Sequence, residues 1–271
     1  MTEPLLLTTT RVSTFRDRQL LTAATGFFFS REERLYLVTS RHVLHDEPSG
    51  HFPDRIELVL HVDPVDLTRT VALSVPLYRD KRAAWRQGLD SGGPVDVAAM
   101  ELDRASLPAG VVLQSFGPAH IGLQSPEVEV GASLRIVGFP LGFYDTLHRL
   151  PVVRHAIVAS SFGVRFQGQG YFLTDARMHR GSSGGPVVMR CPGADAAMPW
   201  LLLGVHAARM DMSTRDRLED ESLGLNCAWY ADILMTLTEQ DAAPPRQGPV
   251  SQASSSSEKP ARRRAATLKG G

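Results

Sequence analysis

A glycine-rich turn in the second half of the chain carries a serine that could act as a nucleophile. The segment TDARMHRGSSGGPVV, residues 174–188, presents Ser183 between glycines. Gly181, Gly184 and Gly185 permit unusual backbone angles and the close approach of a substrate. The backbone N–H groups of Gly181 and Ser183 could converge on a developing oxyanion, where each donor is worth roughly 2.7–4 kcal/mol. Such a turn indicates acyl transfer if a base lies within reach.

A histidine and an aspartate upstream of this turn could activate the serine. His42 follows the apolar run RLYLVTS, so that it would be held rigidly at the end of a strand. Asp96 interrupts the apolar segment VDVAAMEL, and a buried carboxylate is costly unless it is hydrogen-bonded or paired. A histidine N–H would be such a partner and would fix the tautomer of the imidazole. Taken singly, a surface-loop histidine and an edge-strand aspartate remain alternatives.

The order of residues along the chain separates two copies of one motif. Ser-Gly-Gly-Pro occurs at residues 91–94 and again at 183–186. Ser91 lies only five residues before Asp96, which leaves no room for a barrel between acid and nucleophile. Ser183 lies downstream of both partners, and we therefore favour it as the nucleophile.

The elements that must position these residues are expected to be β-strands. Short apolar runs bounded by Gly, Pro, Asp or Ser recur along the chain, and this spacing indicates a sandwich or a barrel. The runs lie at residues 25–30, 35–39, 56–62, 70–77, 95–102, 134–139, 156–160, 171–174, 186–189 and 201–206. Helical periodicity is weak until residues 229–237, where WYADILMTL predicts a closing helix.

Composition bounds the partners of the chain. Its 271 residues include 29 Lys plus Arg and 29 Asp plus Glu, and this neutral balance offers no broad basic face to nucleic acid. No stretch approaches the roughly 20 apolar residues of a membrane span, and no signal-peptide core is visible. The two cysteines, Cys191 and Cys227, favour a reducing compartment, and their spacing indicates no metal site. We expect a cytoplasmic protein without cofactor, metal, membrane or nucleic-acid partner.

In the order His, Asp, Ser, these segments resemble those of the chymotrypsin-like serine proteases. The resemblance is closest to the bacterial Deg-type trypsin-like peptidase domain, whose motifs are matched by TGFFF, LVTSRHV, DVAAM and TDARMHRGSSGGP. GASLRIVGFPLG, LLGVHAA and LGLNCAWYADIL resemble strands of the second barrel and the closing helix of that domain. The resemblance covers about residues 20–237.

By this resemblance, the fold is all-β, with two antiparallel six-stranded Greek-key barrels and the active site between them. An N-terminal segment would occupy residues 1–19, and the peptidase domain residues 20–237, with the barrel boundary near 105–125. Residues 238–271 are rich in Pro, Ser, Ala and Gly, which predicts disorder. Their final LKGG resembles the conjugation tail of ubiquitin-like modifiers, although an unstructured linker is the favoured interpretation.

The resemblance also implies roles for the site residues. Ser183 would attack the carbonyl, His42 would act as general base and then as general acid, and Asp96 would orient His42. His45 is the competing base, but the match of TSRHV favours His42. Ser182 stands where trypsin-type enzymes carry an aspartate that pairs with a new N-terminus, so this route of activation is not expected.

Three further residues resemble specificity determinants. Arg177 stands where trypsin places its acidic pocket residue, and Met178 follows it. His206, in GVHAA, stands where glutamyl endopeptidases and picornavirus main proteases carry a histidine that reads Glu or Gln. Together they predict a preference for an acidic or amide side chain before the cleaved bond. In the alternative interpretation, His206 is a core histidine and Arg177 points outward.

The resemblance implies a serine endopeptidase that acts on protein or peptide substrates. Two alternatives stay open at this point. One is a catalytically silent protein-binding module of the same fold, and the other is a hydrolase that removes a ubiquitin-like modifier. The sequence does not indicate the oligomeric state.

Overall fold

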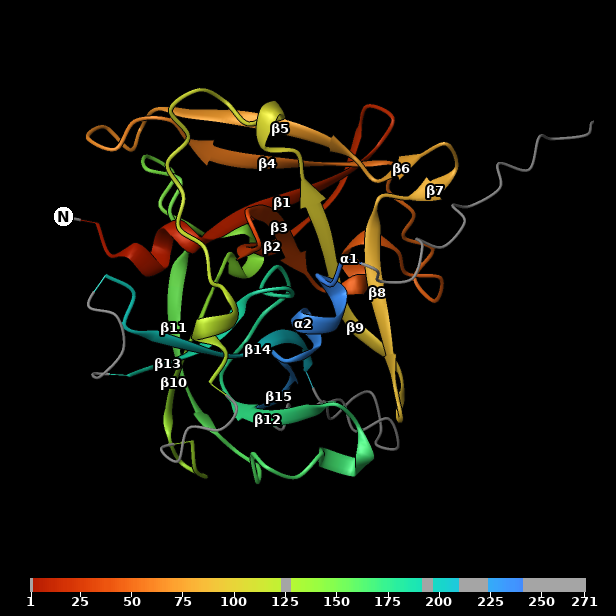
Figure 1. The fold of residues 1–271 in the computed structure, drawn as a ribbon, viewed down its shortest axis with the longest axis vertical. Coiled ribbons are helices and arrows are strands. Elements are labelled where there is room, and N and C mark those ends of the chain that lie inside the picture. Colours follow the sequence, from red (N-terminus) through yellow and green to blue (C-terminus); the bar gives the residue numbers. More distant parts are fainter. Residues whose placement is uncertain (1, 123–127, 192–196, 210–223, 241–271) are drawn as a thin grey trace, which may run out of the picture.

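The computed structural model describes residues 2–122, 128–191, 197–209 and 224–240, and these form two β-structured halves (Figure 1). The strands of the first half are β1 (Thr9–Arg16), β2 (Gln19–Arg31), β3 (Arg34–Thr39), β4 (Arg55–His61), β5 (Thr70–Pro76), β6 (Tyr78–Arg79), β7 (Arg82–Ala83), β8 (Trp85–Asp90) and β9 (Gly93–Leu102). Those of the second half are β10 (Ser133–Gly138), β11 (Val152–Val158), β12 (Tyr171–Asp175), β13 (Pro186–Arg190), β14 (Trp200–Arg209) and β15 (Leu225–Tyr230).

Helices are few and short, as an all-β fold requires. The α-helices are α1 (Arg41–Leu44) and α2 (Ile233–Leu237). Single 3-10 turns are η1 (Pro4–Thr8), η2 (Arg104–Ser106), η3 (Pro118–His120), η4 (Pro140–Gly142) and η5 (Phe166–Gly168). None of the helices in the described ranges is long and apolar enough to cross a membrane.

The second half is a closed six-stranded barrel with the order β10-β11-β12-β15-β14-β13. The first half is a seven-stranded sheet with the order β5-β4-β1-β2-β3-β9-β8, and β6 pairs separately with β7. The all-β prediction is confirmed, and the second barrel closes as expected. The first sheet has one strand more than the expected six, and its edge strands β5 and β8 do not pair with each other. The side chains of β5 are half or fully exposed, so this edge has little apolar surface to fold inward.

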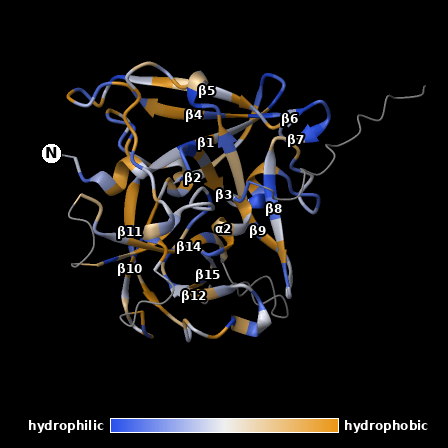
Figure 2. Ribbon diagram, viewed as in Figure 1, coloured by the Kyte–Doolittle hydropathy of each residue, from blue (hydrophilic) through white to orange (hydrophobic). Residues whose placement is uncertain are grey.

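Alternating side chains on the central strands of the first sheet serve two different cores. On β9, Ala98 and Met100 face the interior of the first half, whereas Val97 and Ala99 pack against the second barrel. Because successive side chains of a strand point to opposite faces, a continuous apolar run is what a strand between two cores requires. In Figure 2, β9 is accordingly hydrophobic over much of its length, while the β6–β7 hairpin is hydrophilic.

The end of the described chain ties the two halves together. Helix α2 follows the last barrel strand but lies against the first sheet (Figure 1), where Leu234 and Leu237 are buried. Arg31 donates to the carbonyl of Met235 (2.6 Å), and Arg86 donates to that of Leu237 (3.3 Å). These side chains satisfy carbonyl groups at the helix C-terminus that have no partner within the helix.

Three sequence expectations about the ends of the chain can be compared with this fold. Within the segment 1–19, strand β1 pairs with both β2 and β4 and is therefore part of the first sheet. Of the closing helix expected over 229–237, the first two residues belong to β15, and the helix begins at Ile233. The tail expected over 238–271 lies outside the described residues except for 238–240.

Candidate active site

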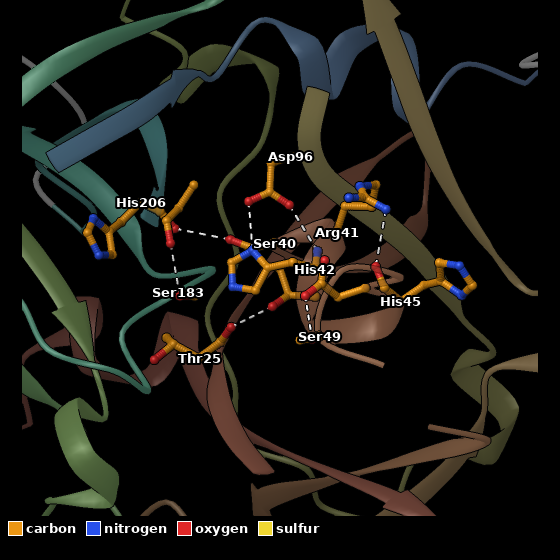
Figure 3. A network of polar contacts seen from close by, with 12 residues as sticks. Thr25, Ser40, Arg41, His42, His45, Ser49, Asp96, Ser183 and His206 are labelled. Carbon is orange, nitrogen blue, oxygen red and sulfur yellow. Dashed lines mark hydrogen bonds and ion pairs between the residues drawn. The ribbon is translucent and has the colours of Figure 1, made fainter. Parts of the chain in front are cut away.

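Neighbouring strands of the first sheet bring His42 and Asp96 together. Strand β3 runs directly into α1, which carries His42, and β3 pairs with β9, which carries Asp96. The Nδ1 atom of His42 lies 2.7 Å from Oδ2 of Asp96 (Figure 3). The backbone N–H of His42 donates to Oδ1 of the same carboxylate at 2.9 Å. With Nδ1–H directed at the carboxylate, Nε2 of the neutral ring is the atom that can accept a proton.

The electrostatic surroundings of His42 favour its charged form. Burial alone lowers the pKa of this imidazole, but the hydrogen bond and the charge of Asp96 outweigh burial and raise it. The charge of Asp46 acts in the same direction, and that of Arg41 opposes it. A group that must take up a proton during a reaction is stabilised in its protonated state by this arrangement.

The Ser183 turn is held tightly between the two halves. Gly184 adopts a φ of +86°, and a Cβ atom on it would lie 2.2 Å from the carbonyl oxygen of Thr25. Gly181 adopts a φ of +92°, and a Cβ there would lie 2.5 Å from the carbonyl oxygen of Phe139. Both positions therefore require glycine, because a side chain would be strained and would collide with backbone. The turn is pinned to β14 by the N–H of Gly184, which donates to the carbonyl of His206 at 2.7 Å.

The hydroxyl of Ser183 does not bond to His42 in this structure. Its Oγ donates instead to the backbone carbonyl of Ala207 at 2.9 Å. Within the described ranges, no hydrogen bond joins Ser183 to His42. The structure thus places His42 and Asp96 in direct contact. Ser183 lies nearby, with its hydroxyl turned toward β14.

His42, Gly181 and Ser183 line one cavity of about 460 Å³. Residues 21–24 of β2 form one wall, and residues 49–52 form another. Imidazole, serine and the Gly181 backbone therefore face a common space that is open to a ligand.

The competing residues lie elsewhere. Nε2 of His45 lies 3.5 Å from Oε1 of Glu47 rather than near Asp96. The hydroxyl of Ser91 accepts a hydrogen bond from Arg165 at 3.1 Å, at the tip of the β8–β9 hairpin. Ser182 is fully buried, and its Oγ has no hydrogen-bond partner among the described residues.

None of the three residues expected to read the substrate side chain lines the cavity beside His42 and Ser183. Arg177 is exposed, and Met178 packs in the core of the second barrel. His206 is 2% exposed, and its imidazole points away from His42 in Figure 3. Burial, with a smaller contribution from the charge of His42, lowers the pKa of His206 to about 4.

Sequence reasoning missed Thr25 and Ser40, two buried hydroxyl residues that connect the halves. Thr25 on β2 donates through Oγ1 to the carbonyl of Gly181 at 2.7 Å. Ser40 donates through Oγ to the carbonyl of His206 at 3.2 Å. Both hydroxyls belong to segments that also matched family motifs, TGFFF and LVTSRHV, but their partners lie more than 150 residues away and give no local signal.

The fold and this site define a class of protein, the trypsin-like serine peptidases. The family model described as "Trypsin-like peptidase domain" matches residues 24–192, which is more than half of the chain. The chain belongs to this family. No curated protein matches the sequence.

Two solved structures are similar to this chain at low sequence identity. The serine endoprotease from Yersinia pestis is 16% identical, with a TM-score of 0.49 over 85% of this chain and 61% of that chain. This chain thus spans less than two thirds of the Yersinia protein. The inactive form of a serine-to-alanine mutant of Rv3671c from M. tuberculosis H37Rv is 14% identical, with a TM-score of 0.44 over 87% of this chain and 89% of that chain.

Proposed function

We propose that this protein is a serine endopeptidase that hydrolyses peptide bonds in protein substrates. His42, Asp96 and Ser183 are its triad, and the reaction passes through an acyl-enzyme. The observation that carries the proposal is the two-point contact of Asp96 with the side chain and backbone of His42, at the edge of a cavity that Ser183 shares. Such contacts select one tautomer and one orientation of the base.

In the proposed reaction, the Ser183 hydroxyl first leaves the carbonyl of Ala207 by rotation about its Cα–Cβ bond. A neutral hydrogen bond of this kind contributes only about 0.5–1.5 kcal/mol, so a bound substrate can replace it. Nε2 of His42 takes the hydroxyl proton as Oγ bonds to the substrate carbonyl carbon. The carbonyl oxygen becomes an oxyanion that accepts from the N–H groups of Gly181 and Ser183.

The same imidazole then completes both halves of the cycle. His42 returns its proton to the leaving amine as the carbon–nitrogen bond breaks, which leaves an ester on Ser183. Water attacks this ester, His42 takes the proton of the water, and the proton passes to Oγ as the acid product departs. Asp96 stays ionised throughout and stabilises the imidazolium that forms in each step.

A preference for an acidic or amide side chain before the cleaved bond is proposed on the position of His206 and Arg177 in the sequence. His206 is buried and Arg177 is exposed, and neither lines the cavity beside Ser183. For the preference to hold, the substrate side chain has to reach these two residues outside that cavity. A peptide library read by mass spectrometry tests it. Absence of Glu, Gln and Asp enrichment at the residue before the cut would refute the preference and leave the peptidase proposal intact.

Two other functions share this scaffold, namely a silent binding module and a hydrolase that removes a ubiquitin-like modifier. A silent module has no need to keep Asp96 bonded to His42, and this contact favours an active enzyme. An isopeptide or ester substrate would use the same acyl transfer, so product analysis has to separate it from peptide cleavage.

The experiment compares the wild type with Ser183→Ala, using a fluorophosphonate probe and intact mass, and Ser91→Ala serves as the matched control. We expect one adduct on the wild type and on Ser91→Ala, mapped to Ser183, and none on Ser183→Ala. Digestion of an unfolded protein substrate by the wild type alone then shows endopeptidase activity. An adduct on Ser91, or a folded wild type that takes up no probe and cuts no substrate, would contradict the proposal.

A further inference from the structure

Hydrogen bonds hold each of the peptide groups around Ser183 in place. Each of the four consecutive carbonyl groups from residue 180 to residue 183 accepts a hydrogen bond. In chain order the donors are Leu141 N–H at 2.6 Å, Thr25 Oγ1 at 2.7 Å, Gly185 N–H at 3.0 Å and Thr25 N–H at 3.0 Å. Thr25 therefore holds two of the four groups, once through its side chain and once through its backbone.

The direction of each carbonyl decides where the neighbouring N–H points. A trans peptide is planar, and its C=O and N–H point in opposite directions. The N–H groups of Gly181 and Ser183 belong to the peptides whose carbonyls are those of residues 180 and 182. The peptides held by Thr25 alternate with these two, so rotation of either Thr25-bonded group would turn an adjacent N–H away from the substrate.

Thr25 is well placed to resist such a rotation. It lies on β2 in the first half, is fully buried, and bonds across to the carbonyl of Gly181 in the second half. Its hydroxyl uses both of its capacities, since Oγ1 donates to the carbonyl of Gly181 and accepts from the N–H of Phe139 at 3.1 Å. Of the described side chains, only that of Thr25 bonds to a carbonyl of the turn from 180 to 183.

The bond to Phe139 supports the same turn indirectly, through the neighbouring loop. Phe139 precedes η4, which contains Leu141, and Leu141 donates to the carbonyl of residue 180. One hydroxyl thus connects the turn with the loop that holds the peptide preceding Gly181. We infer that Thr25 is a positioning residue, which keeps the N–H groups of Gly181 and Ser183 aimed at the oxyanion. This inference rests on the proposed peptidase function.

The test substitutes the hydroxyl alone. Thr25→Val keeps the shape of the side chain and leaves the Gly181 carbonyl and the Phe139 N–H without this partner, whereas Thr25→Ser keeps the hydroxyl. Thr14→Val is the matched control, because Thr14 is also fully buried in the first sheet and its hydroxyl also donates to a carbonyl and accepts from an N–H, both of Thr22. Full-length variants are labelled with a fluorophosphonate over a range of probe concentrations, and thermal melts verify folding.

Loss of a single oxyanion donor slows catalysis by about 10²–10³-fold in known cases, and a misaligned pair of donors should cost about 10- to 100-fold. For Thr25→Val we expect the maximal labelling rate to fall by this factor, while the probe concentration for half-maximal rate stays unchanged. Thr25→Ser should recover most of the rate, and Thr14→Val should label like the wild type. Equal labelling of Thr25→Val and wild type would overturn the inference, and so would equal losses in the two valine variants.

Amide hydrogen exchange provides a measurement that does not depend on activity. The N–H groups of residues 181–184 should exchange faster in Thr25→Val than in the wild type. Their exchange rates in Thr14→Val should equal those of the wild type. Unchanged exchange in Thr25→Val would also overturn the inference. A wild type that takes up no probe would contradict the proposed function instead, and the exchange data would then decide the role of Thr25.

Discussion

Acid should destabilise the folded protein through His206, because the fold holds this imidazole in its neutral form. The side chain is 2% exposed, and its Nδ1 has no hydrogen-bond partner among the described residues. Burial is the larger cause, and the nearby charge of His42 the smaller, of a pKa lowered from the ordinary 6.5 to about 4. The unfolded chain leaves His206 in water with its ordinary pKa.

The sign and size of the effect follow from this difference. Between pH 6.5 and about 4 the unfolded state binds more protons at this residue than the folded state, so stability rises with pH. Above pH 6.5 His206 is neutral in both the folded and the unfolded state, so it costs no stability, and the loss of stability grows as the pH falls from 6.5 toward about 4. The loss from His206 amounts to about 2 kcal/mol at pH 5 and about 3 kcal/mol at pH 4.

Urea unfolding of the full chain at pH 7 and pH 5 measures this loss. His206→Leu removes the titrating group, and His155→Leu removes an exposed histidine as the matched control. We expect the difference in unfolding free energy between the two pH values to be about 2 kcal/mol smaller in His206→Leu than in the wild type or the control. At pH 7 His206→Leu should be no less stable, because a buried polar atom without a partner is itself costly. An identical acid loss in His206→Leu and wild type would refute the reasoning.

Two further predictions concern the acid of the proposed triad and the serine turn. Asp96→Asn should lower the fluorophosphonate labelling rate by about 10⁴-fold, because an amide N–H directed at Nδ1 leaves the proton on Nε2. The residual rate should also reach half its maximum at a lower pH than in the wild type, since Asp96 raises the pKa of His42 and only neutral His42 is a base; an unchanged midpoint would argue against this role. Gly184→Ala should destabilise the fold by about 2–5 kcal/mol in urea, because its Cβ would meet the Thr25 carbonyl at 2.2 Å at a φ of +86°. Gly163→Ala, whose Cβ would meet nothing within 4 Å, is the control, and equal stability of both variants would contradict the strain.

Much of the fold could be predicted from local pattern. All ten apolar runs overlap strands of the structure, because a period of two or a continuous apolar run is what a strand against one core or between two cores requires. The apolar runs missed β1 and β8, since polar and small residues interrupt their apolar positions, and they missed the two-residue strands β6 and β7, which are too short to give a pattern. Strand β15 was expected only through the family resemblance of its segment. The helix expected over 229–237 begins only at Ile233, because Trp229 pairs with Tyr171 and Val205 in the barrel and the backbone there is extended.

The candidate site divides in the same way. The sequence by itself determined the types and the order of His42, Asp96 and Ser183, and the need for glycine beside the serine, because tautomer selection and positive φ angles demand particular residue types. Only the tertiary structure decided that the Ser183 hydroxyl turns to Ala207, that His206 is buried with no partner for Nδ1 among the described residues, and that Thr25 bonds to the carbonyl of Gly181. These outcomes depend on atoms contributed by strands far apart in the chain, and a hydrogen bond selects its partner by position within about 3 Å, which no spacing along the sequence records.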